Sequence, residues 1–214
     1  MILYGSSMSP FVRKVLAFAS EKGMALELQP VGLGDASPDF VAASPFRKMP
    51  GFKDGDFMIS DSTAIITYLD TLQPEPNLIP LEAKARARTV WYEEFADTIA
   101  TGCMAKVFFN KVVSPRFLGK PGDDEVAAKA QSDELPPIVD YLERIMPDSG
   151  FLVEDRLTLA DLAVVSPFVN MSHTGWSVDP ATHPKTAAFV EKILSRPSYA
   201  PVVAKERKFF ERAA

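Results

Sequence analysis

The chain has 214 residues, of which 47% are hydrophobic and 24% charged, and its formal net charge is −5 at pH 7. This composition is typical of a soluble globular protein of one large or two small domains. The negative charge argues against a nucleic-acid partner, and no apolar run approaches the ~20 residues of a membrane-spanning helix. The single cysteine, Cys103, excludes an intrachain disulfide, and His173 and His183 are too far apart to suggest a metal site. We therefore expect a cytoplasmic protein without a metal, which begins on an apolar strand and not on a signal peptide.

The first 23 residues predict a strand, a tight turn and a helix. Residues 1–4 form a short apolar run, and residues 5–9 are mostly small. From Pro10 onward apolar residues recur at helical spacing, Ser9 is a favoured N-cap, and Gly23 is a favoured helix stop. Ser9 should therefore lie where free backbone N–H groups and the positive end of the helix dipole favour an anion.

Residues 26–72 predict the remainder of a small sheet. Residues 26–31 read as a second strand, parallel to the first, and a short helix follows at 38–43. Asp-Gly-Asp at 54–56 is a hairpin turn between antiparallel strands at 51–53 and 57–60, the first of which should lie against the β-α-β unit. Asp61-Ser62 then starts a helix, with Asp61 or Ser62 as its N-cap. The order β-α-β-α-β-β-α is that of a thioredoxin-like sheet.

The segment 73–80 contains three prolines and predicts a linker, and everything after it has helical character. We expect a loop at 112–123, and an interruption near the Pro-Pro pair at 136–137. The expected helices span residues 81–109, 124–146, 158–171, 183–195 and, as one or two helices, 197–212.

A thioredoxin-like half, a Pro-rich linker and an all-helical half together resemble the cytosolic glutathione S-transferases over the whole chain. Three motifs carry the resemblance, each weak alone and strong in this order. They are Ser-Met-Ser-Pro-Phe-Val-Arg-Lys-Val at 7–15, Met49-Pro50 followed after one hairpin by Asp61-Ser62, and Thr-Leu-Ala-Asp at 158–161. Similarity to the bacterial-type, serine-class members implies a glutathione-binding domain at 1–76. It also implies an all-helical domain at 77–214 that contributes the electrophile pocket, and a homodimer.

The resemblance implies how glutathione, the co-substrate, is held. Met49 stands before the cis-proline of the family, so its backbone would pair with the cysteinyl part of glutathione. Ser62 and the helix start would hold the γ-glutamyl carboxylate, and Asp61, where most relatives have Glu, would face the ammonium group, often that of the partner subunit. Lys48 would pair with the glycyl carboxylate. The residues alone also fit a trans Pro50 that opens an edge strand, a plain helix cap and a solvated lysine.

A serine near the first helix is the candidate for activating the thiol. Family members use Tyr, Ser or Cys there, but Tyr4 belongs to the strand and the segment has no Cys. Ser9 is four residues before Arg13, as in the serine classes, and we favour it. Ser7 is the alternative, because zeta-like relatives use a Ser-Ser pair. Either hydroxyl would donate a hydrogen bond to the thiolate and lower its pKa, whereas the plain interpretation of Ser9 is a helix cap.

The resemblance places the electrophile pocket between the two halves, with Phe11, Phe108, Phe109 and Trp176 as candidate walls. Core packing is the plain interpretation of each of these rings taken singly. We expect a detoxifying glutathione transferase that acts on an apolar small-molecule electrophile. A glutathione-dependent lyase, isomerase or dehalogenase and a non-catalytic glutathione-binding protein are the alternatives. Asp161 completes a capping box, and we interpret it as a folding determinant.

Overall fold

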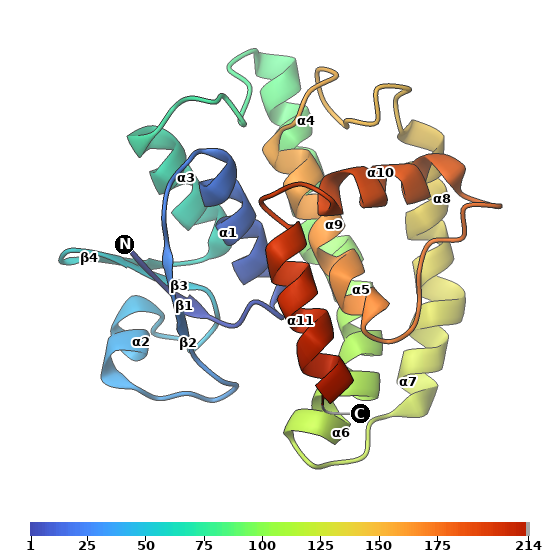
Figure 1. Ribbon diagram of the computed structural model, residues 1–214, viewed down its shortest axis with the longest axis horizontal. Coiled ribbons are helices and arrows are strands. Elements are labelled where there is room, and N and C mark those ends of the chain that lie inside the picture. Colours follow the sequence, from blue (N-terminus) through green and yellow to red (C-terminus); the bar gives the residue numbers. More distant parts are fainter. Residues whose placement is uncertain (213–214) are drawn as a thin grey trace. The chain divides into compact units, whose positions relative to one another are not determined.

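The computed structural model describes residues 1–212 in two compact units, Met1–Leu78 and a second that begins at Ile79. Every named strand of the described chain lies in the first unit, and the second is built from helices (Figure 1). The predicted α/β thioredoxin-like domain followed by an all-helical domain is therefore confirmed.

The four-stranded sheet of the first unit has the order β2-β1-β3-β4. Its strands are β1 Ile2–Gly5, β2 Glu27–Pro30, β3 Gly51–Asp54 and β4 Phe57–Ser60. β1 pairs in parallel with β2 and antiparallel with β3, and β3 pairs antiparallel with β4. The predicted β-α-β unit and the predicted hairpin beside it are both confirmed.

Helices cover both faces of this sheet (Figure 1). They are α1 Pro10–Glu21, α2 Pro38–Ala43 and α3 Ser62–Leu72. Tyr4 packs in a buried cluster with Phe40 of α2. Leu3 points to the opposite face, because side chains alternate along a strand, and its cross-strand partner Phe52 contacts the ring of Tyr68 in α3. The apolar residues of β1 thus pack into two hydrophobic cores, one on each face of the sheet.

A buried lysine at the end of α1 binds the segment that follows α3. The Lys22 ammonium has no exposed surface and donates to the backbone carbonyls of Gln73, Pro74 and Pro76 at 2.7, 3.0 and 2.9 Å. These three carbonyls match the three N–H donors of an ammonium group, and the Asp70 carboxylate, 2.7 Å away, compensates the charge. The Pro-rich segment after α3, predicted only as a linker, is therefore fastened to α1.

The second unit consists of eight α-helices within the described residues, and three π-helical segments join some of them. The helices are α4 Ala83–Glu94, α5 Thr101–Phe108, α6 Ser114–Phe117, α7 Asp124–Lys129, α8 Leu135–Ile145, α9 Leu159–Ser172, α10 Pro184–Leu194 and α11 Ala200–Arg212. The π-helical segments are η1 Phe95–Ala100, η2 Phe109–Val113 and η3 Ala130–Glu134. α9 is buried along almost its whole length and packs against α4, α5 and α10, so it forms the centre of this unit (Figure 1).

The predicted loop at 112–123 is wrong in its first half, because helix continues through η2 and α6 to Phe117. Pro115 lies in the first turn of α6, where its missing N–H is least needed, and the preceding turn is π-helical. The predicted interruption near 136–137 is confirmed as the π-helical η3. It ends at Glu134, which puts Pro136 and Pro137 in the first turn of α8.

The predicted capping box at the start of α9 is confirmed, and its Asp161 side chain makes one further hydrogen bond outside the box. Asp161 Oδ2 accepts the N–H of Thr158 at 2.8 Å and its hydroxyl at 3.2 Å. Asp161 Oδ1 accepts the N–H of Leu152 at 2.8 Å, a contact that the local sequence does not reveal. Burial raises the pKa of Asp161 to about 6, although these donors favour the ionised form. Asp161 thus ties the preceding segment to the central helix.

We expect Asp161→Ala to lower the free energy of unfolding by about 3 kcal/mol, because it leaves the buried N–H groups of Leu152 and Thr158 without an acceptor. Asp161→Asn is the matched control, since it keeps one acceptor oxygen and should lose about 1 kcal/mol. Urea unfolding at pH 7 measures both. An Asp161→Ala protein as stable as the wild type would contradict this role.

The raised pKa of Asp161 also makes stability depend on pH. The folded state binds more protons than the unfolded state between the ordinary carboxyl pKa of 3.8 and the folded value of about 6. The stability of wild type relative to Asp161→Asn should therefore rise as the pH falls through this window, by at most about 1.4 kcal/mol per pH unit. It should be flat above pH 7. Unfolding measured from pH 4 to pH 8 tests this, and a constant difference would argue against the raised pKa.

Candidate functional site

The three strands β1, β3 and β4 bring the sequence motifs to one end of the sheet. Tyr4 lies opposite Gly51, and Gly51 lies opposite Ser60. Because β3 runs antiparallel to both neighbours, the residues after β1, before β3 and after β4 leave the sheet at the same end. The turn at 6–9, Met49-Pro50 and Asp61-Ser62 are those residues.

Gly5 allows two of these segments to approach closely. A Cβ built on Gly5 would lie 2.5 Å from Val12 Cγ2 and 3.5 Å from Met49 Cβ. Real Cβ atoms do not tolerate the first distance, so a side chain at Gly5 would force Val12 or the backbone around it to shift. The lack of a side chain at Gly5 thus leaves room for Val12 of α1 to pack against the end of β1.

Ser9 is the N-cap of α1, with extended backbone angles. Its Oγ accepts the N–H of Val12 at 3.5 Å, which is long for a hydrogen bond, and its N–H donates to the carbonyl of Ser6 at 2.9 Å. The cap uses the hydroxyl as an acceptor, so its O–H hydrogen is left to donate elsewhere. Ser7 lies half-buried in the same turn. Tyr4 is 1% exposed, and burial raises the pKa of its phenol, which fits its predicted place in the strand core.

The Met49-Pro50 peptide bond is cis, as the resemblance predicts, and so is Glu75-Pro76, which the sequence did not suggest. In the segment before Met49-Pro50, the Ser44 hydroxyl accepts a hydrogen bond from the N–H of Lys48 at 3.1 Å and donates one to the carbonyl of Lys48 at 2.6 Å. The backbone leading to Met49 is therefore held in place while the Lys48 side chain is exposed.

Asp61 is the N-cap of α3, which decides between the two predicted caps. Its Oδ1 accepts the N–H groups of Thr63 and Ala64 at 2.9 and 3.1 Å. Its φ is +80°, a left-handed conformation that costs a non-glycine residue about 1 kcal/mol or more. Ser62 is the first residue of α3 and is buried. A strained residue with a helix N-terminus directly behind it is an arrangement that suits anion binding.

The four aromatic candidates lie in different surroundings. Phe11 is half-buried on α1, and Phe109 is 43% exposed. Phe108 is buried 6.4 Å from the ring of His173, whereas Trp176 packs 6.3 Å from the ring of Phe168. Within the helical unit, Phe108 and Trp176 therefore contact different rings.

Sequence reasoning did not find the buried pair between His173 and Glu206. Nε2 of His173 lies 2.9 Å from Oε2 of Glu206, and both side chains are 3% exposed. The pair joins the end of α9 to α11 across 33 residues of sequence, so no local pattern could have revealed it.

Residues 1–212 contain no group of three His, Cys, Asp or Glu side chains that could hold a metal ion. No helix among these residues is long and apolar enough to span a bilayer. Cys103 is buried, and burial raises the pKa of its thiol to about 11. It therefore stays a thiol at neutral pH and is a poor nucleophile.

Known proteins share both halves of this architecture. The chain matches the glutathione S-transferase N-terminal domain family over residues 3–77 and the C-terminal domain family over residues 108–206. A glutathione S-transferase of Hyoscyamus muticus is 33% identical over 213 residues, which cover 95% of this chain and 97% of that protein. Mouse glutathione S-transferase theta-3 is 30% identical over 196 residues, 89% of this chain and 80% of that protein. Maize glutathione S-transferase I, solved with an atrazine glutathione conjugate, superposes with a TM-score of 0.84 at 25% identity, over 96% and 97% of the two chains.

We expect Gly5→Ala to lower the free energy of unfolding by about 2 kcal/mol, because the new methyl group overlaps Val12. Val12→Ala alone should lose a similar amount through the cavity it leaves. The double variant removes the overlap, so its loss should be smaller than the sum by about 1 kcal/mol or more. Chemical unfolding of the three variants measures this coupling, and strictly additive losses would contradict the close approach.

Proposed function

The chain belongs to the glutathione S-transferase family and is a glutathione transferase, and from this premise we propose that a serine at the start of α1 activates glutathione for attack on an apolar electrophile. The observation that carries the proposal is the gathering of three segments at one end of the sheet. They are the turn at 6–9, the cis Met49-Pro50 bond and Asp61-Ser62. Each segment offers a different part of glutathione a partner of suitable chemistry.

In the proposed site, residues 1–76 hold glutathione in an extended form along the sheet end. The backbone of Met49 pairs with the cysteinyl unit, and the hydroxyl and N–H of Ser62 donate hydrogen bonds to the γ-glutamyl carboxylate at the N-terminus of α3. Asp61 faces an ammonium group. Both cap bonds of Asp61 use Oδ1, which supports assigning Oδ2 to that role. The exposed Lys48 ammonium pairs with the glycyl carboxylate.

The proposed catalytic group is the Ser9 hydroxyl, with Ser7 as the alternative. A serine is too weak a base to remove the thiol proton, so its role is to donate a hydrogen bond to the sulfur once it is ionised. This bond and the positive end of the α1 dipole both favour the thiolate and lower the pKa of the bound thiol. The thiolate then forms a carbon–sulfur bond with the electrophile, either by displacing a leaving group or by adding to a double bond that takes up a proton.

The helical domain, residues 77–214, contributes the electrophile pocket in this proposal. Phe108, Phe109 and Trp176 are its proposed apolar walls. Phe109 is 43% exposed, which leaves part of its ring available to a substrate. An aromatic lining selects an apolar small molecule over a charged one.

We also propose that the protein is a cytoplasmic homodimer that serves detoxification. Phe46 is 86% exposed, and Val90 and Trp91 on α4 are 45% and 51% exposed. Large apolar side chains this exposed on a folded protein favour burial against a partner, and aromatic residues are enriched in such interfaces. The single, buried Cys103 supports a reducing compartment.

Ser9→Ala should reduce kcat/KM for conjugation of chlorodinitrobenzene by about 100-fold at pH 7 and move the apparent pKa of bound glutathione toward that of the free thiol. Ser9→Thr keeps the hydroxyl and should retain most activity, and Ser7→Ala is the matched control in the same turn. Rates measured against pH, together with titration of the bound thiolate by its absorbance, give both quantities.

Two outcomes would change the assignment. Collapse of activity in Ser7→Ala with a normal pH profile in Ser9→Ala would transfer the role to Ser7. Normal thiolate formation in both variants would overturn activation by a serine.

A further inference from the structure

We propose that His173, held in place by Glu206, is a positioning residue that fixes the ring of Phe108 and so sets the affinity of the protein for its electrophile. The inference rests on the proposed function, in which Phe108 is a wall of the electrophile pocket. His173 acts through Phe108 and needs no contact of its own with the substrate.

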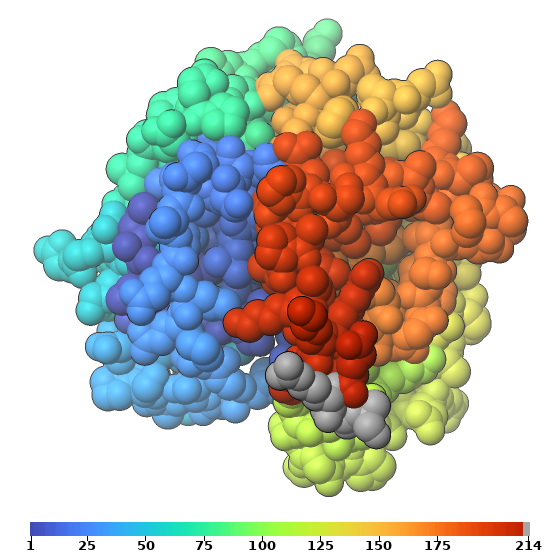
Figure 2. Space-filling view, in the orientation of Figure 1, coloured from blue at the N-terminus to red at the C-terminus, as the bar shows by residue number. Residues whose placement is uncertain are grey.

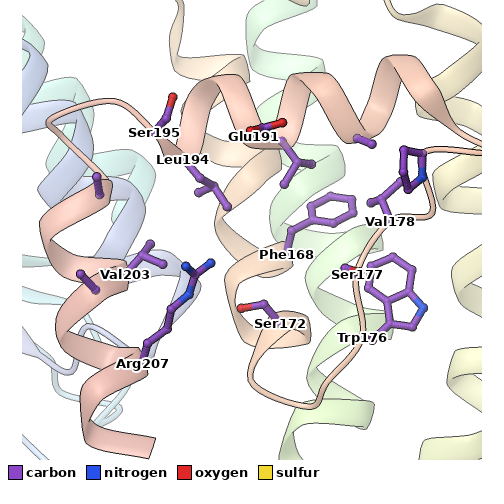
Figure 3. Close-up of a pocket in the computed structure, with 15 residues that line it drawn as sticks. Phe168, Ser172, Trp176, Ser177, Val178, Glu191, Leu194, Ser195, Val203 and Arg207 are labelled. Carbon is purple, nitrogen blue, oxygen red and sulfur yellow. The ribbon is translucent and has the colours of Figure 1, made fainter. Parts of the chain in front are cut away.

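The pair of His173 and Glu206 lies on the inner side of α11. Nε2 of His173 is 2.9 Å from Oε2 of Glu206, and both side chains are 3% exposed. α11, coloured red, lies on the face of the molecule drawn in Figure 2, and Lys205 and Arg207 on either side of Glu206 are exposed. Figure 3 shows the end of α9 beside α11, with Ser172 and Arg207, the sequence neighbours of the pair, on the two helices. Glu206 therefore points away from solvent, toward the end of α9.

The hydrogen bond fixes the orientation of the imidazole. An ionised carboxylate only accepts hydrogen bonds, so Nε2 of His173 carries the hydrogen that it shares with Glu206. Rotation of the ring would break this bond, which is costly in a buried site. The backbone of His173 is also restrained, because its N–H donates to the carbonyl of Val169 at 3.3 Å. Both the backbone and the ring of His173 are therefore held.

Two phenylalanine rings pack against the restrained imidazole. The centroid of the Phe108 ring lies 6.4 Å from that of His173, with an interplanar angle of 47°, and the Phe210 ring lies 4.5 Å away at 38°. Tilted rings at such distances attract one another. Phe108 belongs to α5 and Phe210 to α11, so the imidazole connects these two helices. Phe108 loses part of its support when the imidazole turns or is removed.

The ring contacts continue from Phe210 to the surface. Phe210 lies 5.4 Å from Phe209, which stacks on Phe117 of α6 at 6.0 Å. Phe108 is 6% exposed, whereas Phe209 and Phe117 are 46% and 43% exposed. Five rings thus form a continuous series from the core to the surface. Only the imidazole among them can form a hydrogen bond through its ring nitrogens, so His173 is the member that holds the series in place.

Displacement of Phe108 should act on the KM for the electrophile. An apolar wall makes no bond that forms during the reaction, so it binds the ground state and the transition state alike. Loss of such uniform binding raises KM and leaves kcat unchanged. Glutathione is held by the first unit in the proposed site, so the KM for glutathione should stay constant.

His173→Leu removes both the ring and its hydrogen bond. It should raise the KM for chlorodinitrobenzene about fivefold at saturating glutathione, because one aromatic contact is lost. The values of kcat and of the KM for glutathione should stay within about twofold of the wild type. His183→Leu is the matched control, since Nε2 of His183 lies 2.8 Å from Oδ1 of Asp140 and the same substitution breaks another histidine–carboxylate pair. It should leave all three constants unchanged.

Two further variants separate the ring from its hydrogen bond. His173→Phe keeps a ring that cannot donate to Glu206, and it should raise the KM for chlorodinitrobenzene at least about threefold. Glu206→Gln keeps an acceptor for Nε2 and should change this KM by less than about 1.5-fold. The double variant His173→Phe/Glu206→Gln removes the buried charge and replaces His173→Phe if the single variant does not fold. It should show the same rise in KM.

Phe108→Leu separates the positioning role from the proposed pocket, and it should raise the KM for chlorodinitrobenzene as His173→Leu does. A raised KM in Phe108→Leu with wild-type KM in the His173 variants would overturn the positioning role and leave the pocket standing. An unchanged KM in Phe108→Leu would overturn both. Equal changes in His173→Leu and His183→Leu, or a fall in kcat alone, would also overturn the inference.

Discussion

The register between β1, β3 and β4 is the constraint on which the site depends. Leu3 pairs with Phe52, and Phe52 pairs with Ile59, so one row of apolar side chains faces α3. A slip of one residue would turn this row to the other face of the sheet, so a change of register would cost the free energy of burying these side chains. The same register pairs the next row of residues, which are Tyr4, Gly51 and Ser60. This row determines where each strand leaves the sheet. The geometry of the candidate site therefore follows from packing of the core beneath it.

α1 carries the proposed catalytic serine, and contacts at both ends hold this helix in place. At its start, Val12 lies against Gly5 with no room for a side chain between them. At its end, the Lys22 ammonium is bound by three carbonyls and by Asp70. A buried ammonium is tolerated only when all its donors are used and its charge is compensated, so these contacts act together. A helix restrained in this way holds Ser9 at a fixed distance from the sheet end.

Local signals in the sequence were enough to predict much of the fold, and contacts distant in sequence were not. The hairpin turn at 54–56 and the capping box at Asp161 depend on neighbouring residues, and both are confirmed. Lys22 binds carbonyls about fifty residues away, so its role has no local pattern. The helical course through Pro115 depends on a π-turn that residue propensities do not predict. Residue patterns alone located an anion-favouring helix start, whereas assignment to glutathione came from family resemblance.

Asp61 shows why capping and ligand binding are not competing explanations. A helix cap needs a short side chain that can reach the N–H groups two and three residues ahead, and Asp61 does this with Oδ1 alone. A glutamate, which is longer by one methylene, is a poorer cap at this position. In the proposed site Oδ2 keeps its charge for an ammonium group, so one carboxylate orders the start of α3 and also receives a ligand. The positive φ of Asp61 turns the chain from β4 into α3 within one residue, which places Ser62 at the sheet end. An aspartate at this position thus stabilises the helix start and leaves one carboxylate oxygen for the proposed site.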